Sequence, residues 1–203
     1  MINELKYGNT RTYIIKSKKG SILVDTDWAG TLQNFFKAIK EMGLQVSDIK
    51  YLLITHYHPD HMGIAQDLVD LGIELLVIDK QIDYIHFSDE YLSKNKNDNF
   101  KPINEDLAKI ITCKESREIL KTVGIDGEII HTPGHSDDSI SVIIDNEAAI
   151  VGDLYPIQIA VAYDDMVIKS WNKILSYNVK LAYYAHAKED NIKDINSINE
   201  ISF

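Results

Sequence analysis

Residues 55–63 read Thr-His-Tyr-His-Pro-Asp-His-Met-Gly, so three histidines and an aspartate fall within six consecutive positions. Imidazole nitrogens and carboxylate oxygens are the ligands that suit Zn²⁺, with iron and manganese as harder alternatives. His131-Thr-Pro-Gly-His135, Gly152-Asp153 and His186 follow further along the chain. Histidine is rare here, seven of 203 residues, so this grouping beside aspartates favours a metal site over scattered surface histidines.

The first cluster follows an apolar run, Tyr51–Ile54, that reads as a buried strand. We expect Pro59 to prevent a regular helix, so that residues 56–61 form an irregular loop positioned by a rigid strand. In an extended chain the side chains two residues apart point the same way, which predicts that His56 and His58 face one metal. Asp60 and His61, beyond Pro59, are expected to aim elsewhere.

The order His-x-His-x-Asp-His, Pro-Gly-His, Gly-Asp and His resembles that of the metallo-β-lactamase-fold hydrolases, ligand by ligand, across most of the chain. The resemblance implies an α/β fold, a four-layer αββα sandwich, in a single domain over residues 1–203. Periodicity alone supports only a mixed α/β layered domain. The resemblance also assigns the ligands of two divalent metal ions: His56, His58 and His135 for the first, Asp60, His61 and His186 for the second, and Asp153 bridging both.

Two Zn²⁺ ions are the expected cofactors, with iron or manganese possible. A water molecule between two such ions loses its proton near neutral pH and becomes a hydroxide nucleophile, and Asp60 is the residue expected to hold it and receive a proton.

Asp25, at a strand end, either orients a ligand histidine or is a plain turn residue. His131 is interpreted as structural and His86 as unrelated to the site. Tyr57, inside the ligand loop, is a candidate pocket wall, and Tyr155 a weaker candidate at its mouth.

Two residues differ from those of the true β-lactamases and indicate which branch of the family the chain resembles. The best-known class of true β-lactamases has Arg in place of His61 and a Cys ligand in place of Asp153. The Asp-His and Gly-Asp forms are instead similar to glyoxalase II, lactonases and arylsulfatase-like enzymes. Because only a short stretch follows His186, we expect neither the helical domain with which glyoxalase II holds glutathione nor the additional domain of the nucleases.

Composition limits the partners. The formal net charge of −10 argues against a nucleic-acid-binding surface, which requires a basic footprint, and Asp137-Asp138 beside His135 disfavours a strongly anionic substrate. No apolar stretch approaches the roughly 20 residues that span a bilayer. The N-terminal residues do not resemble a signal peptide, and the single cysteine, Cys113, fits a cytoplasmic protein. We expect a small-molecule substrate, with no nucleic acid or membrane partner; the sequence does not address the oligomeric state.

The elements that must position these residues alternate between strands and helices. A hairpin is expected from residues 11–16 and 21–25. Helices are expected over 31–42, 62–71, 81–93, 115–123, 170–178 and from 188 onward. Further strands are expected over 50–54, 74–78, 127–132, 139–145, 148–152 and 181–185.

The leading functional hypothesis is a metal-dependent hydrolase of a small ester, thioester or lactone. A rival is a di-iron oxidoreductase similar to the flavodiiron proteins, which share this ligand set. Those proteins carry a flavin domain, so this chain would need a separate electron donor. A third hypothesis is a regulatory module that binds metal without turnover.

Overall fold

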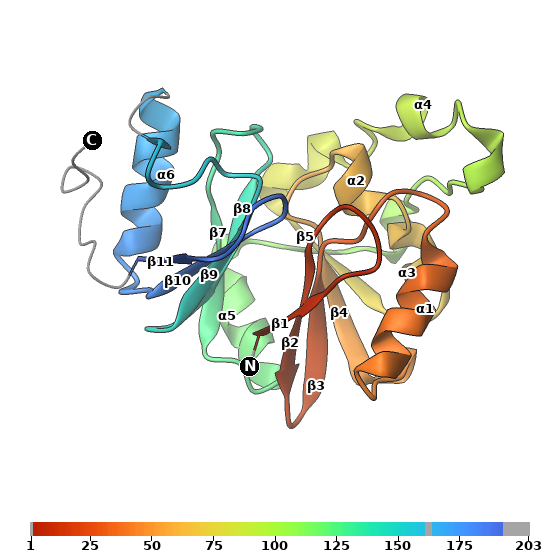
Figure 1. The fold of residues 1–203 in the computed structure, drawn as a ribbon, viewed down its shortest axis with the longest axis horizontal. Coiled ribbons are helices and arrows are strands. Elements are labelled where there is room, and N and C mark those ends of the chain that lie inside the picture. The colour runs from red at the N-terminus through yellow and green to blue at the C-terminus, as the bar shows by residue number, and fades with distance from the viewer. Residues whose placement is uncertain (1, 161–163, 193–203) are drawn as a thin grey trace. The chain divides into compact units, whose positions relative to one another are not determined.

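The computed structural model of the chain describes residues 2–160 and 164–192 (Figure 1). The chain divides into two compact units, residues 1–112 with 122–124, and residues 113–121 with 125–203. Each unit contains one β-sheet. The prediction of a single domain over residues 1–203 stays a prediction. No helix of the described residues is long and apolar enough to cross a membrane.

The first unit is built on a six-stranded mixed sheet in which neighbouring strands follow the chain order. The first three strands pair antiparallel and the last three continue the sheet in parallel. The strands are β1 (Ile2–Leu5), β2 (Thr12–Ser17), β3 (Gly20–Val24), β4 (Ile49–Leu53), β5 (Glu74–Ile78) and β6 (Lys109–Ile111). The helices are α1 (Leu32–Glu41), α2 (Pro59–Met62), α3 (Ala65–Asp70) and α4 (Asp89–Leu92), with 3₁₀ turns η1 (Val46–Asp48), η2 (Asp79–Tyr84), η3 (Lys96–Asp98) and η4 (Glu105–Leu107).

The core of the first unit lies between this sheet and helices α1 and α3, which cover one of its faces (Figure 1). Strands β3 to β5 are almost wholly apolar and buried, as parallel strands covered by helices require. Helix α1 buries Phe35 and Ile39, one helical turn apart, against the sheet. The helix ends at Glu41, and the chain turns away at Gly43, whose φ of +69° a residue with a side chain rarely adopts.

The second unit is built, in its described residues, on a five-stranded sheet of order β11-β10-β9-β8-β7. Strands β9 and β10 pair in parallel and the other neighbours pair antiparallel. Its strands are β7 (Gly127–His131), β8 (Ile140–Ile144), β9 (Ala148–Gly152), β10 (Leu181–Tyr184) and β11 (Asp190–Asn191), and its helices are α5 (Cys113–Thr122) and α6 (Asp165–Leu175). Helix α6 buries Trp171 and Ile174 against Ile143 and Ala149 of the sheet. Arg117 joins α5 to the sheet through ion pairs with Glu128 and Asp145.

Most elements lie within a few residues of their predicted positions, and the exceptions have local causes. Pro59 was predicted to prevent a helix and instead starts one, because proline fits the first helical position, where its missing N–H is not needed. The helix predicted over 62–71 is divided between α2 and α3.

Two other predictions about elements differ from the structure, and two strands were not predicted. The helix predicted over 81–93 is replaced by η2, a run of turns and the short α4. Residues 190–191 form strand β11 where a final helix was expected, and the remainder of that prediction falls on residues 193–203, outside the described residues. Strands β1 and β6 were not predicted, because short edge strands give too few residues for an alternating pattern.

Candidate metal centre

Three histidines of the first unit, His56, His58 and His61, meet beyond the end of β4. His56 Nε2 and His58 Nδ1 lie 3.0 Å apart, and the rings of His56 and His61 are 4.1 Å apart at their centroids. His61 follows on α2, where its N–H donates to the carbonyl of His58 at 3.1 Å. Asp60 Oδ2 lies 3.7 Å from His61 Nε2. The first unit therefore brings all four of its predicted ligands together.

Asp25 orients one of these ligands. Its Oδ2 lies 3.0 Å from Nδ1 of His61, and both residues are buried. The N–H and the hydroxyl of Thr55 donate to the same carboxylate at 2.6 and 2.7 Å. If Nδ1 carries the proton that this carboxylate accepts, Nε2 of His61 keeps its lone pair for a metal ion. Of the two roles that the sequence left open for Asp25, the contact with His61 favours orientation of a predicted ligand.

Asp60 is supported by residues that the sequence did not single out. The Thr10 hydroxyl donates to Asp60 Oδ2 at 3.2 Å, and the N–H of Thr10 donates to Asp27 Oδ2 at 3.3 Å. The other oxygen of Asp27 accepts the N–H of Trp28 at 2.7 Å. Burial raises the pKa of the Asp27 carboxyl, while these backbone N–H groups act in the opposite direction. A threonine 50 positions away gives no local signal, so this contact is read only from the fold.

The second unit has its own cluster of predicted ligands. His135 Nε2 lies 3.6 Å from Asp153 Oδ2, and His186 Nε2 lies 3.4 Å from Asp153 Oδ1. Asp153 follows β9 and His186 follows β10, and these two strands pair in parallel, so their carboxyl ends meet at one edge. Gly134, with φ of +146°, precedes His135, and a Cβ there would approach Val167 at 2.9 Å. Glycine thus allows the backbone to pass close to α6.

A cavity of about 330 Å³ opens beside this second cluster. Its walls combine the three ligands with apolar groups, among them Leu154, Tyr155 and Pro156. The ring of Tyr155 lies 6.1 Å from that of His135. The cavity thus offers an apolar wall next to imidazole and carboxylate groups, and Tyr155 belongs to that wall.

The chain therefore contains His and Asp groups able to hold metal, drawn from His56, His58, Asp60, His61, His135, Asp153 and His186. The donor set fits the metals expected, since neutral imidazole and carboxylate suit Zn²⁺ and the harder transition metals. His86 and His131 belong to none of these groups. His131 Nε2 contacts the carbonyl of Asp137 at 2.7 Å, and His86 pairs with Asp89 and Glu105 on the surface.

One aromatic prediction was wrong. Tyr57, expected to line a pocket, is fully buried in the core of the first unit. Because Tyr57 stands between His56 and His58, alternation turns it away from the ligand side and into the core.

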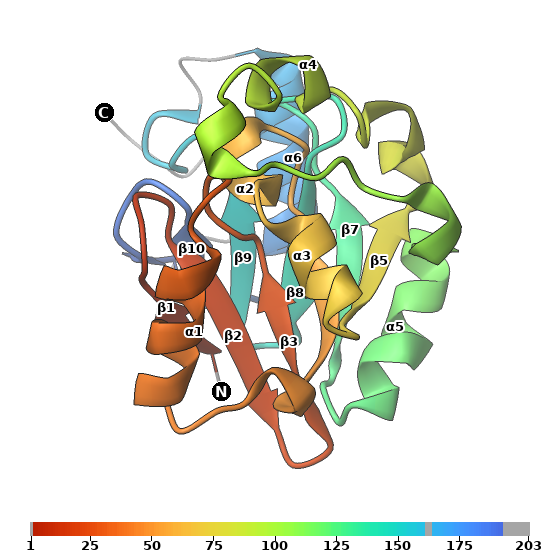
Figure 2. The same cartoon turned by 90° about the vertical axis from the view of Figure 1, so that its right-hand side faces the viewer.

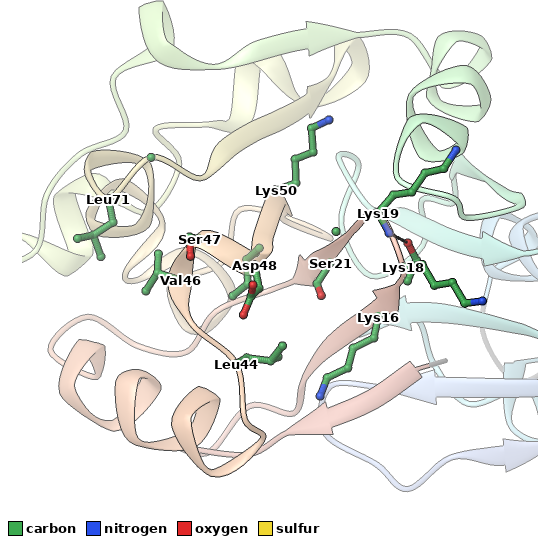
Figure 3. A pocket seen from close by; sticks show the side chains of 14 residues that line it. Lys16, Lys18, Lys19, Ser21, Leu44, Val46, Ser47, Asp48, Lys50 and Leu71 are labelled. Atoms are coloured by element: carbon green, nitrogen blue, oxygen red, sulfur yellow. Dashed lines mark hydrogen bonds between the residues drawn. The ribbon is translucent and has the colours of Figure 1, made fainter.

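A separate cavity, of about 800 Å³, lies at the other end of β4. It is bordered by the β2–β3 turn and by η1, and four lysines surround it: Lys16, Lys18, Lys19 and Lys50. Figure 3 shows that their amino groups point in different directions, so they do not converge on a single point. No predicted ligand lines this cavity.

Known proteins resemble the chain in both sequence and fold. The protein named "Probable metallo-hydrolase MJ0888" of Methanocaldococcus jannaschii is 33% identical over 151 residues, which are 72% of this chain and 68% of that protein. The atrochrysone carboxyl ACP thioesterase of Claviceps purpurea is 27% identical over 149 residues. That match covers 71% of this chain but only 39% of the thioesterase, so the chain spans well under half of that relative.

Solved structures share the fold at low sequence identity. The BLEG-1 B3 metallo-beta-lactamase superposes with a TM-score of 0.72 at 19% identity, covering all of both chains. A metallo-beta-lactamase family protein of Thermus thermophilus gives a TM-score of 0.71 at 19% identity, over 91% of this chain and 71% of that one. These similarities confirm the predicted fold class, an α/β chain with two sheets. The family model of the metallo-beta-lactamase superfamily matches residues 5–186, and the chain therefore belongs to that superfamily.

Proposed function

We propose that the chain is a hydrolase of a small ester, thioester or lactone that depends on two divalent metal ions, Zn²⁺ in the first place. The observation that carries the proposal is the pair of ligand clusters, one in each unit. The first is the loop His56 to His61, with His61 oriented by Asp25. The second is His135, Asp153 and His186. Two of the chain's similar proteins are named as a metallo-hydrolase and a thioesterase, which favours hydrolysis and includes thioesters among the candidate bonds.

In this proposal the ligands divide as the superfamily resemblance implies. His56, His58 and His135 would hold one ion, Asp60, His61 and His186 the other, and Asp153 both. Bound metal would supply a water molecule deprotonated near neutral pH and a positive charge for the developing oxyanion. Hydrolysis forms one C–O bond to the carbonyl carbon and breaks the bond to the alcohol or thiol, which leaves with a proton. Asp60, held by Thr10, is the residue proposed to accept and return that proton.

The proposed substrate is a neutral or singly charged small molecule. The chain carries a net charge of −10, and the exposed Asp137 follows His135 by two residues. Both features disfavour polyanions, including nucleic acids. A cytoplasmic location, expected from the lone Cys113, is part of the same proposal.

Two measurements on the purified protein test the proposal. Metal analysis of protein prepared without chelators should find about two equivalents of zinc, iron or manganese. A panel of esters, thioesters, lactones and phosphodiesters should then show turnover of a carbonyl substrate and little of the phosphodiesters. Faster cleavage of phosphodiesters than of any carbonyl compound would contradict the substrate class.

The same measurements separate the alternatives. Two irons with a visible absorption band, and reduction of O₂ or NO when an electron donor is added, would replace the hydrolase with the oxidoreductase. Full metal occupancy with no turnover of any panel member would favour a regulatory module instead.

A further inference from the structure

The segment between β5 and β6 of the first unit exposes large aromatic side chains. Phe87 is 65% exposed and Tyr91, on α4, is 58% exposed. Figure 2 shows this segment leaving β5 and passing through α4. A single exposed apolar residue is ordinary on a protein surface. The exposure of Phe87 is informative because of where this residue lies.

Phe87 lies against a predicted metal ligand. Its ring centroid is 5.6 Å from that of His58, and the two ring planes are inclined by 32°. One part of the phenyl ring therefore contacts the imidazole, while most of its surface faces solvent. A molecule that approaches His58 from solvent would therefore contact the exposed phenyl ring of Phe87.

Buried hydrogen bonds hold the segment against the loop. The hydroxyl of Ser88, the residue after Phe87, donates to the carbonyl of Tyr57 at 2.6 Å. Gln81 Nε2 donates to the carbonyl of Ile54 at 2.9 Å. Ser88 and Gln81 are both buried. The phenyl ring is therefore placed beside His58 by its own backbone, and binding to it costs little ordering of the segment.

A second exposed aromatic residue lies further along the same segment. Tyr91 follows Phe87 by four residues, and its ring lies 6.2 Å from that of Trp28. These two aromatic residues border a cavity of about 410 Å³. The segment therefore has two exposed aromatic rings, Phe87 beside His58 and Tyr91 beside the cavity.

We infer that Phe87 is a specificity-determining residue that binds the acyl chain of the substrate, and that the preferred substrates carry medium-length apolar acyl groups. The inference rests on the proposed hydrolase function and names its substrate class. In esters and thioesters of small polar alcohols or thiols, the acyl chain is the apolar part. Removing such a chain from water onto an aromatic surface stabilises the complex in proportion to the area covered.

The test compares p-nitrophenyl acetate with p-nitrophenyl octanoate, which share a leaving group and differ only in the acyl chain. Phe87→Ala should lower kcat/KM for the octanoate about tenfold and for the acetate less than twofold. Phe87→Leu, which keeps an apolar side chain, should recover most of the octanoate activity. Leu107→Ala removes another exposed apolar residue of the same segment, 53% exposed, and should leave both substrates unchanged.

A binding measurement separates this inference from the proposed function. Calorimetric titration with octanoate, a product rather than a substrate, should give an affinity about tenfold weaker for Phe87→Ala than for the wild-type protein. If no ester is turned over, the hydrolase proposal fails, while octanoate binding still decides the role of Phe87. Equal losses with acetate and octanoate, or unchanged octanoate affinity, would overturn the inference.

Discussion

The carboxylate of Asp25 contacts Nδ1 of His61 and so favours the proton on that nitrogen, although Asp25 is not a predicted ligand itself. Asp25→Asn keeps a residue that tolerates the observed φ of +61° but removes the charge that faces His61 Nδ1. Metal affinity should fall about 10- to 100-fold, as for other residues that orient a ligand histidine. Competition with a chromophoric chelator measures this affinity. Asp83→Asn, at an exposed carboxylate of η2, is the matched control, and an equal loss there would contradict the assigned role of Asp25.

His58 and His86 provide a second comparison at the scale of single residues. His58→Ala removes a proposed ligand and should lower kcat by at least about 10³-fold, because activation of the nucleophile contributes several kcal/mol to the barrier. His86→Ala removes only surface ion pairs with Asp89 and Glu105, which contribute little. Its activity and metal content should match the wild type. Equal damage from both variants would show that the ligands are assigned wrongly.

At this scale the sequence predicted the residues that are clustered along the chain and missed those that meet only in the fold. The donors at 56–61 stand out because four of them occupy six positions. Thr10 and Asp27 support Asp60, yet neither has a distinctive neighbour in the sequence. Tyr57 was placed in the pocket because of its position in the motif, whereas its side chain packs in the core.

At the scale of elements, α2 and its junction with α3 depend on one glycine. A Cβ at Gly63 would lie 2.1 Å from the backbone nitrogen of Ala29 and 2.5 Å from the carbonyl oxygen of Asp27. Gly63→Ala should therefore lower the free energy of unfolding by about 3 kcal/mol, since neither neighbour is a flexible side chain. Gly43→Ala meets no atom within 4 Å and should cost only about 1 kcal/mol, from its positive φ. Urea denaturation of both variants measures the difference, and equal costs would contradict the close approach.

Helix α6 begins at a side-chain cap. Asp164 Oδ1 accepts the N–H groups of Met166 and Val167 at 2.9 and 3.1 Å. Asp164→Ala should lower the free energy of unfolding by about 1 kcal/mol. Asp165→Ala, one position further on, removes a first-turn charge but no capping bond, and should cost less. The order of the two urea midpoints checks the cap, and a reversed order would argue against it.

The sequence predicted an element well where burial gave it a clear pattern of apolar residues. Strand β5 matches its prediction of 74–78, because a short apolar run between turn residues leaves few alternatives. The helix predicted over 81–93 is replaced by turns, in which backbone N–H groups bond three residues back, as Phe87 does to Tyr84. The side chains of Gln81 and Ser88 bond to the carbonyls of Ile54 and Tyr57. Their partners lie in the ligand loop and the strand before it, which local spacing cannot reveal. Helix α6 begins before the predicted residue 170, because its start is set by Asp164.

At the scale of the whole molecule, metal removal should lower thermal stability. A ligand that binds only the folded state stabilises it by about 4 kcal/mol at a free concentration 1,000 times its dissociation constant. For a chain of this length that corresponds to roughly 10 °C in Tm. Calorimetry with and without a chelator measures the shift. His58→Ala should show a much smaller one, and an unchanged Tm for the wild-type protein would contradict metal binding by the folded chain.

The fold class was predictable because the order of ligand motifs extends over most of the chain, as the match to residues 5–186 also does. Hydrophobic periodicity would not have sufficed, since it identifies strands and helices but not which strands pair. The parallel pairing of β10 with β9 is an example. Residues 153–180 separate the two strands, and no local pattern specifies that they pair.

The uneven spacing of the ligands along the chain has a consequence for how metal is acquired during synthesis. The donors of the first unit lie within six residues, so a nascent chain that has exposed only this stretch already carries a chelating peptide, with little loop-closure entropy to overcome. His135, Asp153 and His186 come from three distant segments and reach one another only when their sheet has formed. A nascent chain could therefore bind a metal ion at His56 to His61 before His135, Asp153 and His186, which complete both proposed sites, are in place.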